Sequence, residues 1–193
     1  MEEYAYEREQ REARKKKFYG FIEFGIFLLA AAAAAYIIIN FVAQRTIVEG
    51  NSMNTTLNDG DSLIVEKVSY IFGDIHRFDI VVFPYYDDKR GEDVYYIKRV
   101  IGLPGEAIRI TDGKIYINGE ELKENYGYYV NDMPMEGYDA EEEYIIEENQ
   151  YFVLGDNRNL SVDSRRIGCI SGDDIVGKAV FRIFPLKDFG FIN

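Results

Sequence analysis

The chain of 193 residues, with 47% hydrophobic and 29% charged positions, suits one globular domain plus further segments, since a domain takes roughly 100 to 200 residues. Its net charge of -12 argues against nucleic acid as a partner, because phosphate binding needs clustered lysines and arginines. Cys169 is the only cysteine, which excludes an intramolecular disulfide and metal clusters held by several thiolates.

A long apolar segment lies near the N-terminus. Residues 24–43 read FGIFLLAAAAAAYIIINFVA, which is uncharged and about the length that crosses a hydrocarbon core as a helix. A cleaved signal peptide is the main alternative, but its apolar region is typically about 7 to 15 residues long. We therefore predict one transmembrane helix at residues 21–43, preceded by a polar tail at residues 1–20.

Charges flank this segment unevenly. A basic run precedes it, whereas the early downstream flank offers Arg45 followed by acidic residues. The positive-inside rule then places the N-terminus in the cytoplasm and residues 44–193 outside the membrane. A solvated tail with interspersed glutamates is the alternative explanation of the basic run, which consists of Arg8, Arg11, Arg14, Lys15, Lys16 and Lys17.

The rest of the chain contains short β-favouring runs separated by Gly, Asp, Asn and Pro. We predict strands at residues 46–49, 62–67, 80–83, 94–101, 107–110, 114–117, 151–154 and 175–184. The Asp-Gly in ITDGKIYING indicates a hairpin, and an acidic, tyrosine-rich stretch follows it. The expected fold class is mainly β, with an antiparallel β body at residues 44–193 and a small β insertion or cap at about residues 107–150.

A serine and a lysine stand out as a candidate nucleophile and base. Ser52 lies in the small turn GNSMN soon after the apolar segment. The only histidine, His76 in GDIHRFDIVVF, is typical of an exposed turn, so a Ser-His triad is unsupported. Lys98 instead lies inside the apolar run VYYIKRVIG, where Tyr96 and Val100 would share its strand face.

The solvation of Lys98 decides whether it can act as a base. With a reference pKa near 10.4, only about one lysine in a few thousand is neutral at pH 7, whereas desolvation can lower the pKa by roughly 3 to 5 units. A neutral amine could take the proton of a serine hydroxyl. The alternative is an edge strand with the amine in water, and the sequence pattern leaves both open.

Three blocks occur in order along the chain: SM with TL and GD at residues 52–61, then YYIKRVIGLPGE, then VLGDNRNLSVDSRRIG. Together with the N-terminal anchor they cover most of the chain, and they resemble the bacterial type I signal peptidases in their short, Gram-positive form. The resemblance implies a β-rich catalytic body with a smaller β insertion. It also implies a membrane-anchored serine endopeptidase that removes signal peptides from exported preproteins, outside the membrane and after small residues of the Ala-x-Ala type.

By this resemblance, Ser52 is the nucleophile and Lys98 is its general base. The lysine takes the hydroxyl proton, an ester-linked acyl-enzyme forms, and the same lysine activates the water that releases it. The backbone N–H of Ser52 is expected to donate to the oxyanion, with help from the backbone near Gly50. Many family members carry Ser at the Gly50 position, and the usual Pro after the nucleophile is replaced here by Thr55.

The third block is expected to support this pair. The resemblance implies that Ser161 hydrogen-bonds near the lysine amine and orients it, and that Asp163 and Arg165 form a polar pair. Asp156 and Arg158 are expected to brace the same loop. The alternative for all five residues is an ordinary polar turn with surface ion pairs, which contribute little to stability. Arg99, on the opposite strand face from the lysine, is expected to be structural.

The implied substrate sets the expected partners and pockets. Small side chains before the cleavage site imply shallow apolar pockets beside an extended peptide, and Val48, Met53 and Ile97 are the candidates for their walls. Each of the three is equally consistent with a place in the core. No cofactor or metal is expected, because no ligand spacing or phosphate loop is present. The expected partners are signal peptides and membrane lipid, in proximity to the secretion translocon.

Two other protein classes share parts of this pattern. Self-cleaving repressors also use a Ser-Lys dyad on a β fold, but this chain shows a membrane anchor and no helix-turn-helix for DNA. An anchored β domain that binds an exported partner, or an inactive relative of the peptidase, is the second alternative. It differs from the peptidase in whether a neutral Lys98 reaches Ser52.

Overall fold

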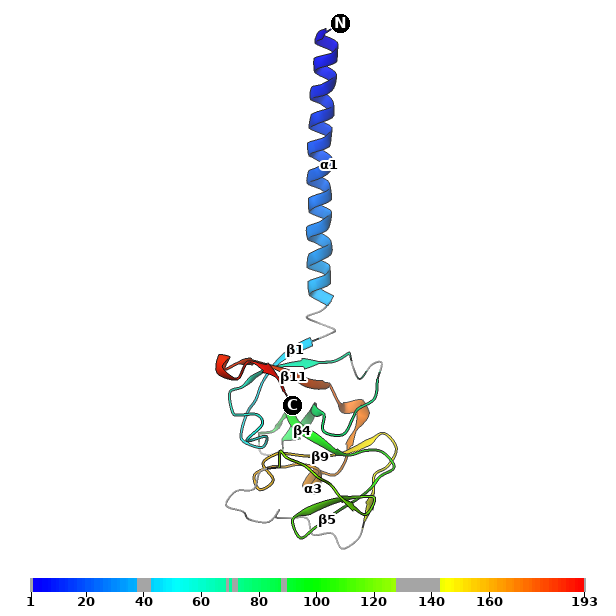
Figure 1. Cartoon of the computed structure of the whole chain (residues 1–193), viewed down its shortest axis with the longest axis vertical. Coiled ribbons are helices and arrows are strands. Elements are labelled where there is room, and N and C mark those ends of the chain that lie inside the picture. Colours follow the sequence, from blue (N-terminus) through cyan, green and yellow to red (C-terminus); the bar gives the residue numbers. More distant parts are fainter. Residues whose placement is uncertain are drawn as a thin grey trace. The chain divides into compact units, whose positions relative to one another are not determined.

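The computed structural model describes residues 2–37, 43–68, 70, 73–87, 90–127 and 143–192, and the chain divides into two compact units, Met1–Val42 and Ala43–Asn193. The first unit contains one long helix, α1 (Glu2–Ile37), drawn in blue in Figure 1. Its segment Arg14–Tyr36 is long and apolar enough to cross a membrane, and none of it is buried by protein. An apolar helix without a polar stripe is suited to lipid, as the sequence predicted.

The boundary of the predicted span differs slightly from the structure. Residues 38–42 of the predicted segment lie outside the described part of the chain, and its last residue, Ala43, is the first residue of a strand. The helix also extends toward the N-terminus through the basic run that the sequence assigned to a tail.

The second unit is built from antiparallel strands, which confirms the predicted mainly-β fold class. Its larger sheet has the order β1-β2-β11-β3-β4-β9-β10, with β12 beside β11. These strands are β1 (Ala43–Ile47), β2 (Ser62–Glu66), β3 (Ile80–Asp87), β4 (Glu92–Gly102), β9 (Gln150–Leu154), β10 (Ile170–Ser171), β11 (Gly177–Phe184) and β12 (Gly190–Phe191). Each predicted run that falls in this sheet overlaps one of these strands.

A smaller sheet has the order β7-β6-β5-β8 (Figure 1 labels β5). It consists of β5 (Ala107–Thr111), β6 (Lys114–Ile117), β7 (Glu120–Glu121) and β8 (Tyr144–Ile145). The turn between β5 and β6 is the predicted Asp-Gly hairpin, and both Asp112 and Gly113 have positive φ, as a two-residue turn of type I′ requires. Short helices complete the unit: α3 (Ser164–Ile167), η3 (Gly172–Asp174) and η4 (Leu186–Asp188).

Three apolar clusters hold this unit together, and β4 contributes to all of them. Ile97 packs into the cluster below β1 and β2, Val100 into a cluster with β3 and β9, and Ile101 into the cluster between the two sheets. Burying each such side chain stabilises the fold by about 1.5 to 3 kcal/mol. The second half of β4 is therefore covered on both faces and fixed in position.

Candidate active site

Lys98 lies in this fully covered half of β4, and its position follows from the strand. Of its two neighbours, Ile97 packs into the core and Arg99 is buried against Asp156, so the strand cannot turn the lysine toward water without exposing them. Its side chain is 3% exposed. The structure thus decides between the two alternatives that the sequence left open, and places the amine in the interior.

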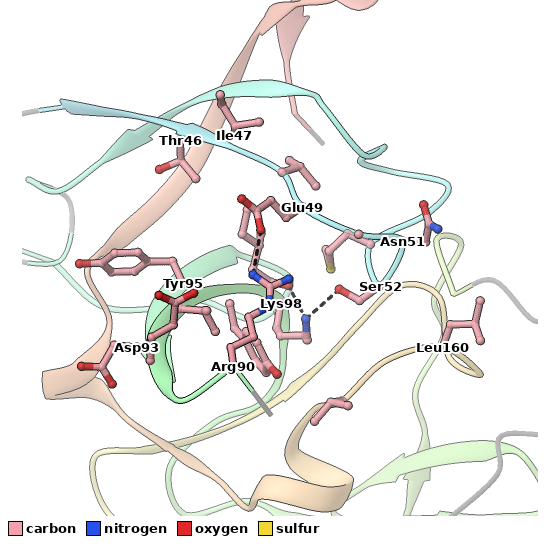
Figure 2. Close-up of a pocket in the computed structure, with 18 residues that line it drawn as sticks. Thr46, Ile47, Glu49, Asn51, Ser52, Arg90, Asp93, Tyr95, Lys98 and Leu160 are labelled. Carbon is pink, nitrogen blue, oxygen red and sulfur yellow. Dashed lines mark hydrogen bonds and ion pairs between the residues drawn. The ribbon is translucent and has the colours of Figure 1, made fainter. Parts of the chain in front are cut away.

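Ser52 lies in the turn that connects β1 and β2. The base of this connection is closed by backbone hydrogen bonds between Val48 and the segment at Gly60 and Asp61, at 2.8 and 2.9 Å. Met53 and Leu57, which follow the serine, are almost completely buried and anchor the turn in the core. The serine itself stays half-buried and faces a pocket (Figure 2).

The two side chains meet. Lys98 Nζ lies 2.8 Å from Ser52 Oγ and donates a second hydrogen bond to the carbonyl of Ile97 at 2.9 Å, and Figure 2 shows the serine contact. The Tyr96 ring lies beside the amine, with its centroid 4.9 Å from Nζ. A serine hydroxyl and a lysine amine at this separation can exchange a proton directly.

Burial lowers the pKa of Lys98 to about 8. The nearby carboxylates of Asp163 and Asp156 act in the opposite direction and raise this pKa, but their effect is smaller. At a pKa of about 8, roughly a tenth of the molecules carry a neutral amine at pH 7, compared with one in a few thousand for an exposed lysine. The desolvated site therefore supplies a usable base near neutral pH.

The serine and lysine open into a pocket of about 670 Å³. One wall is residues 46–53 and the other is residues 92–98 of β4, and Arg90, Leu160 and Val162 complete the lining. Within the described sheet, β1 pairs only with β2, and the stretch of β4 at this wall pairs only with β3. Both walls therefore offer an unpaired strand edge, and the pocket is a groove that an extended peptide can enter.

The three predicted wall residues lie where the groove meets the core. Val48, Met53 and Ile97 all line the pocket and are 4%, 1% and 7% exposed, respectively. They are also members of one apolar cluster. The two roles considered from the sequence, lining the pocket and packing in the core, thus coincide in these side chains.

Asp163 and Arg165 face each other in the buried loop that follows β9. Arg165 donates to both carboxylate oxygens of Asp163 at 2.8 Å, and both side chains are almost completely buried. The same carboxylate accepts a hydrogen bond from the Gly155 N–H at 3.0 Å and caps the short helix α3. This pair fixes the loop beside the lysine.

Asp156 pairs with Arg99, in a two-pronged contact at 2.9 and 2.8 Å between fully buried groups. Arg158 bonds instead to the carbonyl of Gly155 and to Glu124 from the segment after β7. The two residues therefore brace the loop through different partners. The sequence offered no signal for Glu124, because it lies outside the three blocks and reaches the loop only through the folding of the smaller sheet.

Two expected contacts are absent. The Ser161 hydroxyl is buried and, within the described residues, has no hydrogen-bond partner, so it does not bond to the Lys98 amine. It packs instead against Gly155, where even a methyl group would overlap it. The Gly50 N–H donates to the carboxylate of Asp59 at 2.7 Å, so it is not directed at an oxyanion in this structure.

Asn157, which the sequence analysis did not single out, contacts the turn at residues 48–61 that carries Ser52, called the nucleophile turn below. Its backbone N–H donates to the Ser52 carbonyl at 3.0 Å, and its side-chain amide donates to the Asn51 carbonyl at 3.1 Å.

His76 is an exposed turn residue, as predicted, with 75% of its side chain accessible. The described ranges contain no group of three or more His, Cys, Asp or Glu side chains arranged to hold a metal ion.

Comparison with known proteins gives consistent matches. The family model for signal peptidase, peptidase S26, matches residues 21–184. The chain is 36% identical over 174 residues to a probable signal peptidase I-2 of Synechocystis, covering 89% of this chain and 77% of that protein. It is 41% identical over 161 residues to signal peptidase I of Bacillus caldolyticus, covering 78% and 85%.

A crystal structure of a signal peptidase I from Enterococcus faecalis aligns with a TM-score of 0.42 and 33% identity, over 54% of this chain and 96% of that one. The family model spans most of the chain, from within the apolar helix to the end of β11. The chain therefore belongs to the signal peptidase family, peptidase S26, whose members are membrane-anchored serine peptidases that remove signal peptides from preproteins.

Proposed function

We propose that Ser52 and Lys98 carry out this reaction, so that the chain cleaves signal peptides from exported preproteins after small residues of the Ala-x-Ala type. The observation that carries the proposal is the 2.8 Å contact between Lys98 Nζ and Ser52 Oγ, with the amine buried at the floor of a peptide-sized groove. A binding domain without activity has no need of a desolvated lysine against a serine hydroxyl, which destabilises its own fold.

The proposed reaction has two halves. As Ser52 Oγ attacks the scissile carbonyl carbon, the neutral Lys98 amine accepts the hydroxyl proton and the carbonyl oxygen becomes an oxyanion. The oxyanion collapses, the carbon–nitrogen bond breaks, and the lysine returns the proton to the leaving amine. A water then attacks the ester with Lys98 as the base, and Ser52 regains its proton as the acid product leaves.

The groove accounts for the proposed preference for small side chains. An extended signal peptide can pair its backbone with the open edges of β1, up to residue 47, and of β4 at residues 92–98, which places alternate side chains toward the floor. The floor is closed by Val48, Met53 and Ile97, which cannot retract because the close-packed core leaves no space behind them. Small residues therefore fit at the two floor positions nearest Ser52, and large ones do not.

The arrangement across the membrane is part of the proposal. The basic run before the apolar helix favours a cytoplasmic tail at residues 1–20, a span at residues 21–43 and a catalytic body at residues 44–193 on the outer side, with residues 107–150 as a cap. Such an anchor holds the site close to lipid and to the secretion translocon, where signal peptides are retained. Protease added outside intact cells should degrade a C-terminal tag and spare an N-terminal one.

The cleavage test uses the full-length protein in lipid or detergent. Wild type should cut a preprotein after Ala-x-Ala, and Ser52→Ala and Lys98→Ala should each reduce kcat/KM by at least about a hundredfold while remaining folded. An inert wild type on several well-presented substrates, or variants that cut equally well, would refute the Ser52 and Lys98 assignment and favour an anchored binding protein.

A further inference from the structure

The backbone around Ser52 is held by a residue that has no part in the proposed proton transfer. Asn157 is 2% exposed and lies in the loop that follows β9. Its side-chain amide donates to the Asn51 carbonyl at 3.1 Å, and its own N–H donates to the Ser52 carbonyl at 3.0 Å. The peptide units on both sides of the nucleophile are thus tied to one residue.

The bond to the Asn51 carbonyl also determines where the Ser52 N–H points. The carbonyl of Asn51 and the N–H of Ser52 belong to one peptide unit, which is planar and trans. In a trans unit the two groups point in opposite directions. A side chain that holds the carbonyl on one side therefore holds the N–H on the other.

The direction of this N–H matters because other oxyanion donors are scarce. The Gly50 N–H is bonded to the Asp59 carboxylate at 2.7 Å, and glycine offers no hydroxyl at that position. The Ser52 N–H, by contrast, has no acceptor within the part of the chain that the structure describes. A donor without a partner beside the nucleophile can bind the oxygen that becomes negative.

We propose that the carboxamide of Asn157 is a positioning group, which orients the Ser52 N–H toward the oxyanion through the Asn51 carbonyl. This inference rests on the proposed function, since it assumes that Ser52 is the nucleophile. Asn157 itself touches neither the substrate nor the reacting atoms. Its contribution should appear only once the carbonyl oxygen has become negative, and not when the peptide is merely bound.

The side chain can be tested separately from the backbone bond. Asn157→Leu keeps the approximate shape and the backbone N–H but removes the amide donor, and it adds no charge that could alter the lysine. Asn157→Ala removes the donor with less bulk, in case leucine does not fit. Asn58→Ala, at an exposed position of the nucleophile turn, is the matched control and should behave like wild type.

Four readouts on the full-length protein distinguish positioning from a structural role. We expect kcat to fall about 10- to 100-fold in both Asn157 variants with KM changed less than twofold, because removing an oxyanion donor outright costs roughly 100- to 1000-fold. A peptide aldehyde, whose carbonyl carbon bonds to Ser52 Oγ to give a tetrahedral adduct, should lose affinity by a similar factor. The cleaved signal peptide should bind as before, and the pH midpoint of kcat/KM should stay in place.

Other results would overturn the inference. Equal losses of aldehyde and product affinity would show a damaged groove, and a shifted pH midpoint would show an effect through Lys98. If thermal melts show that both Asn157 variants are unfolded, the residue is needed for the fold and not for positioning. If wild type and Ser52→Ala are both inert, the proposed function fails; if Ser52 is essential and the Asn157 variants match wild type, only this inference fails.

Discussion

The buried lysine should destabilise the protein that depends on it, and replacing it with methionine measures by how much. Methionine has a similar length and no charge, so Lys98→Met keeps the core filled while removing the ammonium. The variant should lose signal-peptide cleavage and yet resist unfolding at least as well as wild type at pH 7. Loss of activity with a gain in stability is the opposite of what a misfolded variant shows.

The magnitude follows from the lowered pKa of Lys98, about 8 in the folded chain against 10.5 for the free side chain. The difference corresponds to about 3 kcal/mol, the cost of burying the charge rather than the neutral amine. Below pH 8 both folded and unfolded lysine are protonated and the cost is fully present. Between pH 8 and pH 10.5 the folded form binds fewer protons than the unfolded form, so the cost decreases as the pH rises.

The Lys98→Met variant also lacks the two hydrogen bonds that the amine makes to Ser52 and Ile97. Their loss cancels about 1 to 2 kcal/mol of the stability gained by removing the buried charge. The net gain at pH 7 is therefore about 1 to 2 kcal/mol. The dependence on pH is the sharper expectation: the advantage of Lys98→Met over wild type should fall by about 2 to 3 kcal/mol between pH 7 and pH 10.

The assay is thermal unfolding of the full chain in detergent, followed by tyrosine circular dichroism because the protein has no tryptophan. For a body of this size, 1 kcal/mol of stability shifts Tm by about 2 to 4 °C. The expected change with pH in the stability difference between Lys98→Met and wild type is therefore readily measured. Lys123→Met, at an exposed position, is the control and should follow wild type at every pH. Parallel stability curves for wild type and Lys98→Met would show that the amine is not desolvated, and the proposed base would be wrong.

Three further variants test the surroundings of the pair. Gly155→Ala should lower kcat at least tenfold, measured by substrate cleavage, because the added methyl group would lie 2.5 Å from the Ser52 carbonyl oxygen and displace the nucleophile turn. Glu124→Gln should lower Tm by several degrees, because it removes the carboxylate charge that faces the buried guanidinium of Arg158, and unchanged melting would contradict this role. Arg165→Gln should raise the pH midpoint of kcat/KM, since an unpaired carboxylate beside the buried lysine favours its protonated form, and an unmoved or lowered midpoint would refute that coupling.

The sequence predicted those parts of the site that depend on strand periodicity. The run around Lys98 is apolar on both sides, which is typical of a strand covered on both faces. The predicted strands at residues 80–83 and 151–154 flank it in the sheet, as β3 and β9. The residue pattern places Lys98 within the strand. Whether its amine is buried or exposed depends on the neighbouring strands, which the pattern does not show.

The partners of the polar side chains could not be predicted in this way. Asp156 was assigned to the same bracing role as Arg158, yet its carboxylate pairs with Arg99, which is 57 residues away in the sequence. Tyr126, which stacks on that arginine at 4.0 Å, comes from the segment after β7 of the smaller sheet. The first pairing depends on β9 lying beside β4 in the larger sheet, and the second on how the segment after β7 folds back onto β4. The periodicity of a single strand carries no information about either.

The buried ion pairs also explain how a lysine can remain a base beside two carboxylates. Asp156 and Asp163 both raise the pKa of Lys98, and each is held by an arginine, Arg99 or Arg165, at 2.8 Å. A paired carboxylate attracts a third charge much less than a free one, so the arginines leave desolvation as the dominant effect on the amine. Buried pairs of this kind contribute little net stability. Their clearest consequence at this site is electrostatic, because they allow carboxylates to shape the loop while the lysine still loses its proton near neutral pH.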